Sequence, residues 1–493
     1  MIGFVRRQAG ANGWGLGLEV TALVLEQEPI RIVLCGVDTL GIPDHEADEL
    51  RSRVATAVRA APVGVLLNWN HTHCAPPASP VLLARSGLLA IEFDERVNAY
   101  AQLVGERTIA CVREAARRLE PAGIAWGTGE VDLSVNRRER GPDGQIVHGW
   151  RTDGLLDRQV LTLQARRLDG SAICTVVGYG CHPVSVGMDV DHTSSDFPGA
   201  LRRRLRDWTG GECVFFQGAA GNVLPRIAFR SDEIEAERMG ERLAIEAVHA
   251  LADRAAWPRR LVARSDSSLI PMILFRYEDS PPGPVPLAAV EERVDFPVLP
   301  PPPPPALARL REEYDAAVVE AEARGAEAAE LYGLHYHAKW ARVMAGASRA
   351  DGNLGPVHAV RIGDGVIITA PGEAFTEIGM AVKERSPGGP TLYAGYTNGA
   401  VGYFPTAASY SEGGYEPAYS NRSYGRLAPQ APECERLLVE RGVRLAESLF
   451  PGAQPYTGGV WAATGAVPEL PRERVERPAE AGYAPPPTAP PPG

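Results

Sequence analysis

Apolar runs that end in a metal-ligand type of side chain recur along this chain, and they constrain its fold more than any other feature. The first run, residues 63–67, leads within a few residues into His71-Thr72-His73. In an extended chain, residues two apart point to the same side, so His71 and His73 can serve one site. Neutral imidazole nitrogens are good zinc donors, and the pair therefore indicates a candidate metal site.

The same pattern returns downstream, each time with a strand-like run ahead of a polar side chain. The runs and side chains are 173–177 before His182, 366–369 before Glu373, and 392–396 before Tyr403. In α/β sheets, ligands gather at the carboxyl ends of the strands. We therefore expect these strand ends to bring two histidines, a glutamate and a tyrosine to one place.

Strand-like and helix-like segments alternate over most of the chain. Further strands are expected at 20–25, 31–37 and 131–135, and helices at 45–60, 95–119, 232–252 and 433–449. This alternation predicts an α/β fold, with a layered mixed β-sheet in one large domain flanked by helices.

Two segments depart from the alternation. Residues 300–305 are all proline, and the helix-rich segment after them is charged over much of its surface. We expect an insertion at about 296–345 that packs on the outside of the domain. Residues 455–493 are rich in proline and short of large apolar side chains, so we expect a mostly disordered tail after a domain that spans residues 1–454.

Charge and composition exclude several classes of protein. Lys plus Arg number 50 against 61 Asp plus Glu, a net charge of −11, which argues against a general nucleic-acid binder. No apolar stretch approaches the ~20 residues of a membrane span. The N-terminus lacks an apolar signal core, and the seven cysteines include no Cys-x-x-Cys pair, so we expect a cytoplasmic protein with reduced thiols. The sequence does not indicate an oligomeric state.

Short motifs with catalytic residue types occur in a defined order along the chain. They are His71-Thr72-His73, Asn136-Arg137, His182-Pro183, Gly221-Asn222-Val223, Pro371-Gly372-Glu373, Asn398 to Tyr403, and Tyr415-Glu416. Taken together and in this order, they resemble the neutral/alkaline ceramidases, which are zinc-dependent amidases that cleave N-acyl sphingoid bases. The resemblance implies that residues 1–454 form a ceramidase-like amidase domain.

The resemblance also implies a role for particular side chains. One zinc ion per chain would be held by His71, His182, Glu373 and Tyr403. His73 would shuttle a proton at the attacking water, and Arg137 and Tyr415 would hold the scissile amide and its developing oxyanion. The implied reaction is hydrolysis of the amide bond of a small N-acyl substrate, either a ceramide-like lipid or another acyl amide. Amide formation is chemically possible at the same site.

Differences from the family's pattern leave the substrate and two other functions open. Asn222 and Leu224 stand where the family has aspartate and serine, and we expect this change to redirect substrate choice away from ceramide. Cys74 stands where the family usually has serine, so a cysteine hydrolase that uses Cys74 with His71 or His73 is an alternative. A non-catalytic scaffold with a structural zinc ion is another.

Overall fold

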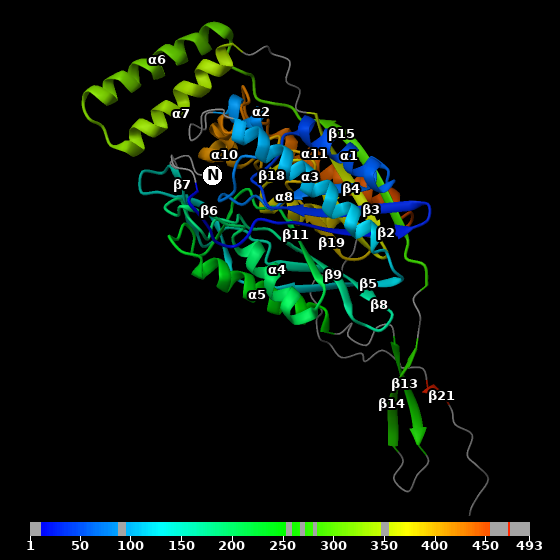
Figure 1. Cartoon of the computed structure of the whole chain (residues 1–493). Coiled ribbons are helices and arrows are strands. Elements are labelled where there is room, and N and C mark those ends of the chain that lie inside the picture. The colour runs from blue at the N-terminus through cyan, green and yellow to red at the C-terminus, as the bar shows by residue number, and fades with distance from the viewer. Residues whose placement is uncertain are drawn as a thin grey trace, which may run out of the picture.

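The computed structural model describes residues 11–86, 95–252, 259–266, 272–279, 283–346, 354–453 and 472–473. Three mixed β-sheets make up the body of this part of the chain (Figure 1). Their strands, in spatial order, are β2 (Val20–Gln27), β3 (Ile30–Val37) and β4 (Val65–Trp69); β11 (Glu212–Gln217), β9 (Ala172–Tyr179), β8 (Gln159–Arg167) and β5 (Ala122–Glu130); and β15 (Leu287–Asp295), β16 (Leu354–Ile362), β17 (Gly365–Thr369) and β19 (Thr391–Ala394). Each of these sheets contains one parallel pair, β3–β4, β9–β11 and β17–β19, beside antiparallel neighbours.

The three sheets share one apolar core, to which each sheet contributes the side chains of one face. The side chains of the other face pack against helices. In β3, Leu34 lies in the shared core, whereas its neighbours Val33 and Cys35 face the helices outside. Val176 and Val177 of β9 divide in the same way. A strand that is buried on both faces needs apolar residues at every position, which explains the unbroken apolar runs in the sequence.

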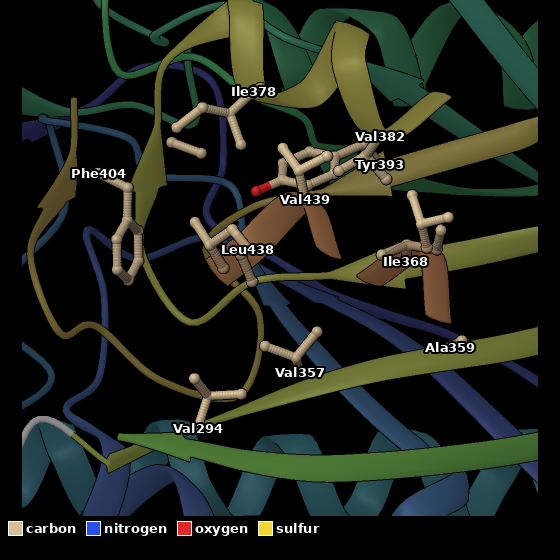
Figure 2. Close-up of a cluster of buried hydrophobic side chains, with 14 of the residues drawn as sticks. Val294, Val357, Ala359, Ile368, Ile378, Val382, Tyr393, Phe404, Leu438 and Val439 are labelled. Atoms are coloured by element: carbon tan, nitrogen blue, oxygen red, sulfur yellow. The ribbon is translucent and has the colours of Figure 1, made fainter. Parts of the chain in front are cut away.

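A pair of helices covers the outer face of each sheet. The pairs are α1 (Asp44–Val58) with α3 (Glu95–Arg117) on the β2–β4 sheet, α4 (Phe197–Thr209) with α5 (Ile234–Ala250) on the β5–β11 sheet, and α8 (Thr376–Arg385) with α11 (Glu433–Leu449) on the β15–β19 sheet. Figure 2 shows the cluster under α8 and α11, which contains Val382 of α8, Leu438 of α11 and Ile368 of β17. The expected layered α/β fold is confirmed.

One expected strand, 131–135, is only partly right, because only residues 134 and 135 lie in a strand. Residues 131–133 do not continue a strand but connect β5 to β6 (Ser134–Arg140), which pairs with β7 (Ile146–Arg151) and β12 (Val223–Pro225). Val131 and the partly buried Leu133 still pack in the apolar cluster under α4 and α5. Their apolar character reflects burial in a connection, which the local sequence does not distinguish from burial in a strand.

The segment 296–345, where we expect an insertion, contains a hairpin of α6 (Pro304–Ala323) and α7 (Ala328–Ala345), which extends from the body (Figure 1). It does not pack only on the outside. Tyr332 and Tyr336 of α7 form a buried cluster with Leu83 of α2 (Pro80–Arg85) and Val97 of α3. The reason is that α7 presents large aromatic side chains toward the body.

The remaining elements are short or lie apart from the sheets. They are β1 (Gly13–Trp14) paired with β10 (His192–Thr193), β18 (Glu373–Ala374) paired with β20 (Tyr403–Phe404), β13 (Arg259–Asp266) paired with β14 (Met272–Asp279), α9 (Ser409–Glu412), α10 (Tyr415–Ala418), and the 3₁₀ turns Pro62–Gly64 and Ser420–Arg422. The expected disordered tail lies outside the described residues, except for β21 (Arg472–Glu473), which pairs with β13. Among the described helices, none is both long and apolar enough to cross a membrane.

Candidate metal centre and active site

Each of the three sheets delivers one candidate ligand from a strand of its parallel pair. His71 follows β4, His182 follows β9, and Glu373 lies in β18, shortly after β17. In the two-stranded pair β18–β20, Glu373 and Tyr403 are in register. The structure therefore brings together the ligand types that the sequence places after separate strands, and the site lies where the three sheets meet.

Two buried amide side chains connect the ends of these sheets. Asn68 of β4 accepts a hydrogen bond from the Gln217 backbone N–H of β11 at 2.7 Å and donates to the Gly395 carbonyl after β19 at 2.7 Å. The Gln217 amide in turn donates to the Cys181 carbonyl at 2.8 Å, next to His182. Asn68 and Gln217 are fully buried, so these hydrogen bonds form without competition from water and hold the strand ends in fixed relative positions.

His71 and His182 are oriented by backbone carbonyls. His71 Nδ1 lies 2.5 Å from the Leu40 carbonyl, and His182 Nδ1 lies 2.6 Å from the Ala220 carbonyl. A carbonyl only accepts, so each Nδ1 carries the proton and each Nε2 has its lone pair available for a metal. Burial lowers the pKa of His182 to about 4, with a further contribution from the Arg137 guanidinium, which keeps this ring neutral near pH 7.

His73 lies beside these two rings but is only partly buried. Its ring centroid lies 5.0 Å from that of His71 and 5.7 Å from that of His182. Ring nitrogens of all three histidines fall within 4.8 Å of one another. The three imidazoles can thus serve one metal ion or its immediate surroundings.

Glu373 completes the donor set from the side of the third sheet. Its Oε2 lies 3.3 Å from His71 Nε2 and 3.0 Å from His182 Nε2. Two phenol hydroxyls donate to the same carboxylate, Tyr396 to Oε2 at 3.0 Å and Tyr424 to Oε1. Neutral imidazoles with a carboxylate form a donor set that zinc accepts, so the residues present fit this ion.

Tyr403 and Arg137 form a second, adjoining layer. Arg137 Nη2 donates to Tyr403 Oη at 3.0 Å, and Arg137 Nε donates to Glu416 at 2.8 Å. Glu416 is fully buried and also accepts from Arg138 at 2.7 Å. Arg137 therefore holds the Tyr403 hydroxyl in place, while Glu416 balances the charge of the two guanidinium groups.

A small hollow opens over the donor set. It has a volume of about 60 Å³ and is lined by Leu40, Gly41, His71, His73, Leu82, Glu373, Ala400, Tyr403, Tyr415, Ser423 and Tyr424. Of the seven residues that the sequence proposes for the site, five line this hollow. The other two, His182 and Arg137, lie behind Glu373 and Tyr403.

Sequence reasoning missed several residues that shape the site. Tyr396 and Tyr424 hold Glu373, and Ser423 bonds the Tyr415 hydroxyl at 3.0 Å. For Ser423 and Tyr424, the only signal was the density of tyrosine and serine in the Gly-rich segment 410–424, and Tyr396 stood only as the last residue of the strand-like run 392–396. Such a signal does not say which hydroxyl reaches which partner.

The Gly221-Asn222-Val223 loop lies behind the hollow. Asn222 Oδ1 accepts from Thr376 N at 2.8 Å at the start of α8, and Leu224 lies in an apolar cluster with Val135. Neither side chain lines the hollow. The expectation that Leu224 and Asn222 set substrate choice by contact with the substrate therefore finds no support, because both side chains point into the protein.

Cys74 also points away from the hollow. The residue is fully buried in the same apolar cluster as Leu224, and its Sγ lies 3.9 Å from the Val186 carbonyl. A nucleophile must reach the substrate and be activated by an adjacent base. The position of Cys74 disfavours the cysteine-hydrolase alternative.

Comparison with known proteins identifies the architecture. A crystal structure of neutral ceramidase from Pseudomonas aeruginosa matches with a TM-score of 0.58 and 18% identity, over 90% of this chain and 72% of that one. The chain has the neutral ceramidase fold. A second ceramidase structure, complexed with C2, matches this fold with a TM-score of 0.57 and 17% identity, over 92% of this chain and 75% of that one. No family model and no curated protein sequence matches the chain.

Proposed function

We propose that the protein is a zinc-dependent amidohydrolase that cleaves the amide bond of a small N-acyl substrate. The observation that carries this proposal is the convergence of His71, His182 and Glu373 from three different sheets, with both histidine Nδ1 atoms held by backbone carbonyls. Such second-layer hydrogen bonds are typical of metal-binding histidines. The neutral ceramidase fold supports the same reaction class by analogy.

His71, His182, Glu373 and Tyr403 would hold the metal. When bound, zinc would polarise a water molecule and the substrate carbonyl. His73 lines the hollow and would take a proton from the attacking water, then return it to the amine nitrogen as the C–N bond breaks. Tyr415 also lines the hollow, and its hydroxyl would donate to the developing oxyanion. Arg137 does not line it, so we assign it a positioning role through Tyr403.

The size of the hollow bears on the substrate. Pockets for drug-sized ligands usually enclose several hundred Å³. The hollow here has about 60 Å³, which suits a short acyl group better than a long chain. We therefore propose a short-chain N-acyl amine or amide in preference to ceramide.

One experiment tests both parts of the proposal. Purified protein is analysed for zinc and then incubated, with and without a chelator, with N-acyl amines whose acyl chains run from acetyl to palmitoyl, and with ceramide. Chelator-sensitive release of amine, with the highest kcat/KM for short chains, is the expected result. Activity that survives chelation but is lost with iodoacetamide and in Cys74→Ala would favour the cysteine hydrolase. Metal binding without turnover of any substrate would favour the scaffold. Ceramide as the best substrate would refute the size argument and leave the amidohydrolase proposal standing.

A further inference from the structure

The α6–α7 hairpin holds the segment that supplies Tyr415 and Tyr424 to the site. Arg422 lies over the ring of Trp340, with 4.6 Å from its Cζ to the ring centroid, and donates to the Tyr314 hydroxyl at 3.1 Å. Trp340 Nε1 donates to the Arg426 carbonyl at 2.9 Å. Both helices of the insertion therefore contact the chain on either side of Ser423 and Tyr424.

One contact continues from the hairpin into the hollow. Tyr336 of α7 lies 2.9 Å, hydroxyl to hydroxyl, from Ser423, and Ser423 lies 3.0 Å from the hydroxyl of Tyr415. Tyr336 is 4% exposed, whereas Ser423 and Tyr415 line the hollow. The three hydroxyls form an unbroken chain from the insertion to the substrate position.

The direction of the protons in this chain decides what Tyr415 can do. A hydroxyl has one proton to donate and lone pairs to accept. When Tyr336 donates to Ser423 and Ser423 donates to Tyr415, the Tyr415 proton is available to the substrate. When Tyr415 instead donates its hydroxyl proton to Ser423, it has no proton left to donate to an oxyanion.

We propose that Tyr336 is a positioning residue that sets this direction, so that Tyr415 donates into the hollow. The inference rests on the proposed function, in which Tyr415 stabilises the developing oxyanion. Chains of hydroxyls with one proton direction strengthen each member's hydrogen bond. The insertion would then contribute to turnover without touching the substrate.

Tyr336→Phe removes the first hydroxyl and keeps the ring that packs against Leu83 and Val97. We expect kcat to fall on the order of 10-fold, with KM and zinc content little changed. Ser423→Ala should behave in the same way, and Ser423→Thr, which keeps the hydroxyl, should restore turnover. In a Tyr415→Phe background, Tyr336→Phe should have no further effect, because the hydroxyl through which Tyr336 would act is then absent.

Tyr314→Phe is the matched control. It removes a hydroxyl from the same hairpin, and this hydroxyl contacts the same segment at Arg422 but does not belong to the row of hydroxyls formed by Tyr336, Ser423 and Tyr415. Equal losses in Tyr314→Phe and Tyr336→Phe, or an undiminished loss from Tyr336→Phe in the Tyr415→Phe background, would show that the hairpin acts by packing and would overturn the inference. An unaffected Tyr336→Phe variant of an active protein would do the same and leave the proposed function intact. A wild-type protein without any amidase activity would refute the proposed function, and this role with it.

Discussion

Glu416 is the side chain whose removal tests the electrostatic design of the site most directly. The carboxylate is fully buried and bonds Arg137 Nε at 2.8 Å and Arg138 Nη1 at 2.7 Å, and both arginines are themselves 3% exposed. Glu416→Gln keeps the shape and removes the charge. Two guanidinium groups then remain buried without their principal counterion.

The expected cost follows from this burial. Removal of one partner from a buried ion pair destabilises a protein by about 3–5 kcal/mol, because the remaining charge stays desolvated. Glu412→Gln is the control, since Glu412 contacts the same Arg138 at 3.2 Å but is 26% exposed. Exposed pairs contribute at most about 1 kcal/mol. Urea unfolding of the two variants and the wild type measures the difference.

The pH dependence of stability provides a second test of the role of Glu416. Burial alone would raise the pKa of Glu416, but the adjacent Arg137, His148 and Arg138 hold it well below its ordinary value of 4.5. A carboxyl with a lowered folded pKa contributes stability above its unfolded pKa and loses it as the pH falls. The difference between wild type and Glu416→Gln should therefore shrink below about pH 4. A Glu416→Gln variant no less stable than Glu412→Gln at pH 7 would refute this reasoning.

Three further outcomes are expected. His182→Ala should lose bound zinc in elemental analysis, whereas His73→Ala should keep it and lose turnover on the order of 10²–10⁴-fold; the reverse result would exchange their roles. Asn68→Ala breaks the buried bonds between three strand ends and should lower the free energy of unfolding by about 2–4 kcal/mol in urea titrations, and a cost below 1 kcal/mol would mean that the sheets do not depend on it. Burial raises the pKa of Asp196 to about 6 from 3.8, so the folded protein should lose stability as the pH rises through this range, and Asp196→Asn should flatten that part of a urea-measured pH profile.

Much of the fold follows from local sequence patterns. The helix expected at 433–449 is α11, residue for residue, and the strands expected at 20–25, 31–37 and 366–369 lie in β2, β3 and β17. Periodicity reports on the burial of each segment's own side chains, so it works where a segment is long and regular. It did not distinguish 131–133 from a strand, and it did not reveal that three separate sheets share one core.

The candidate site was likewise predictable only in part from the sequence. The sequence by itself determined that His71, His182 and Glu373 follow strands, because ligand residue types after apolar runs can be recognised from neighbours in the chain. Only the tertiary structure decided that Tyr396 and Tyr424 hold Glu373, that Glu416 balances Arg137, and that α7 reaches Tyr415 through Ser423. The contact between Tyr336 of α7 and Ser423 joins residues that are 87 positions apart in the chain. Hydrogen-bond partners are chosen by distance in space, and local sequence carries no information about which distant segments will meet.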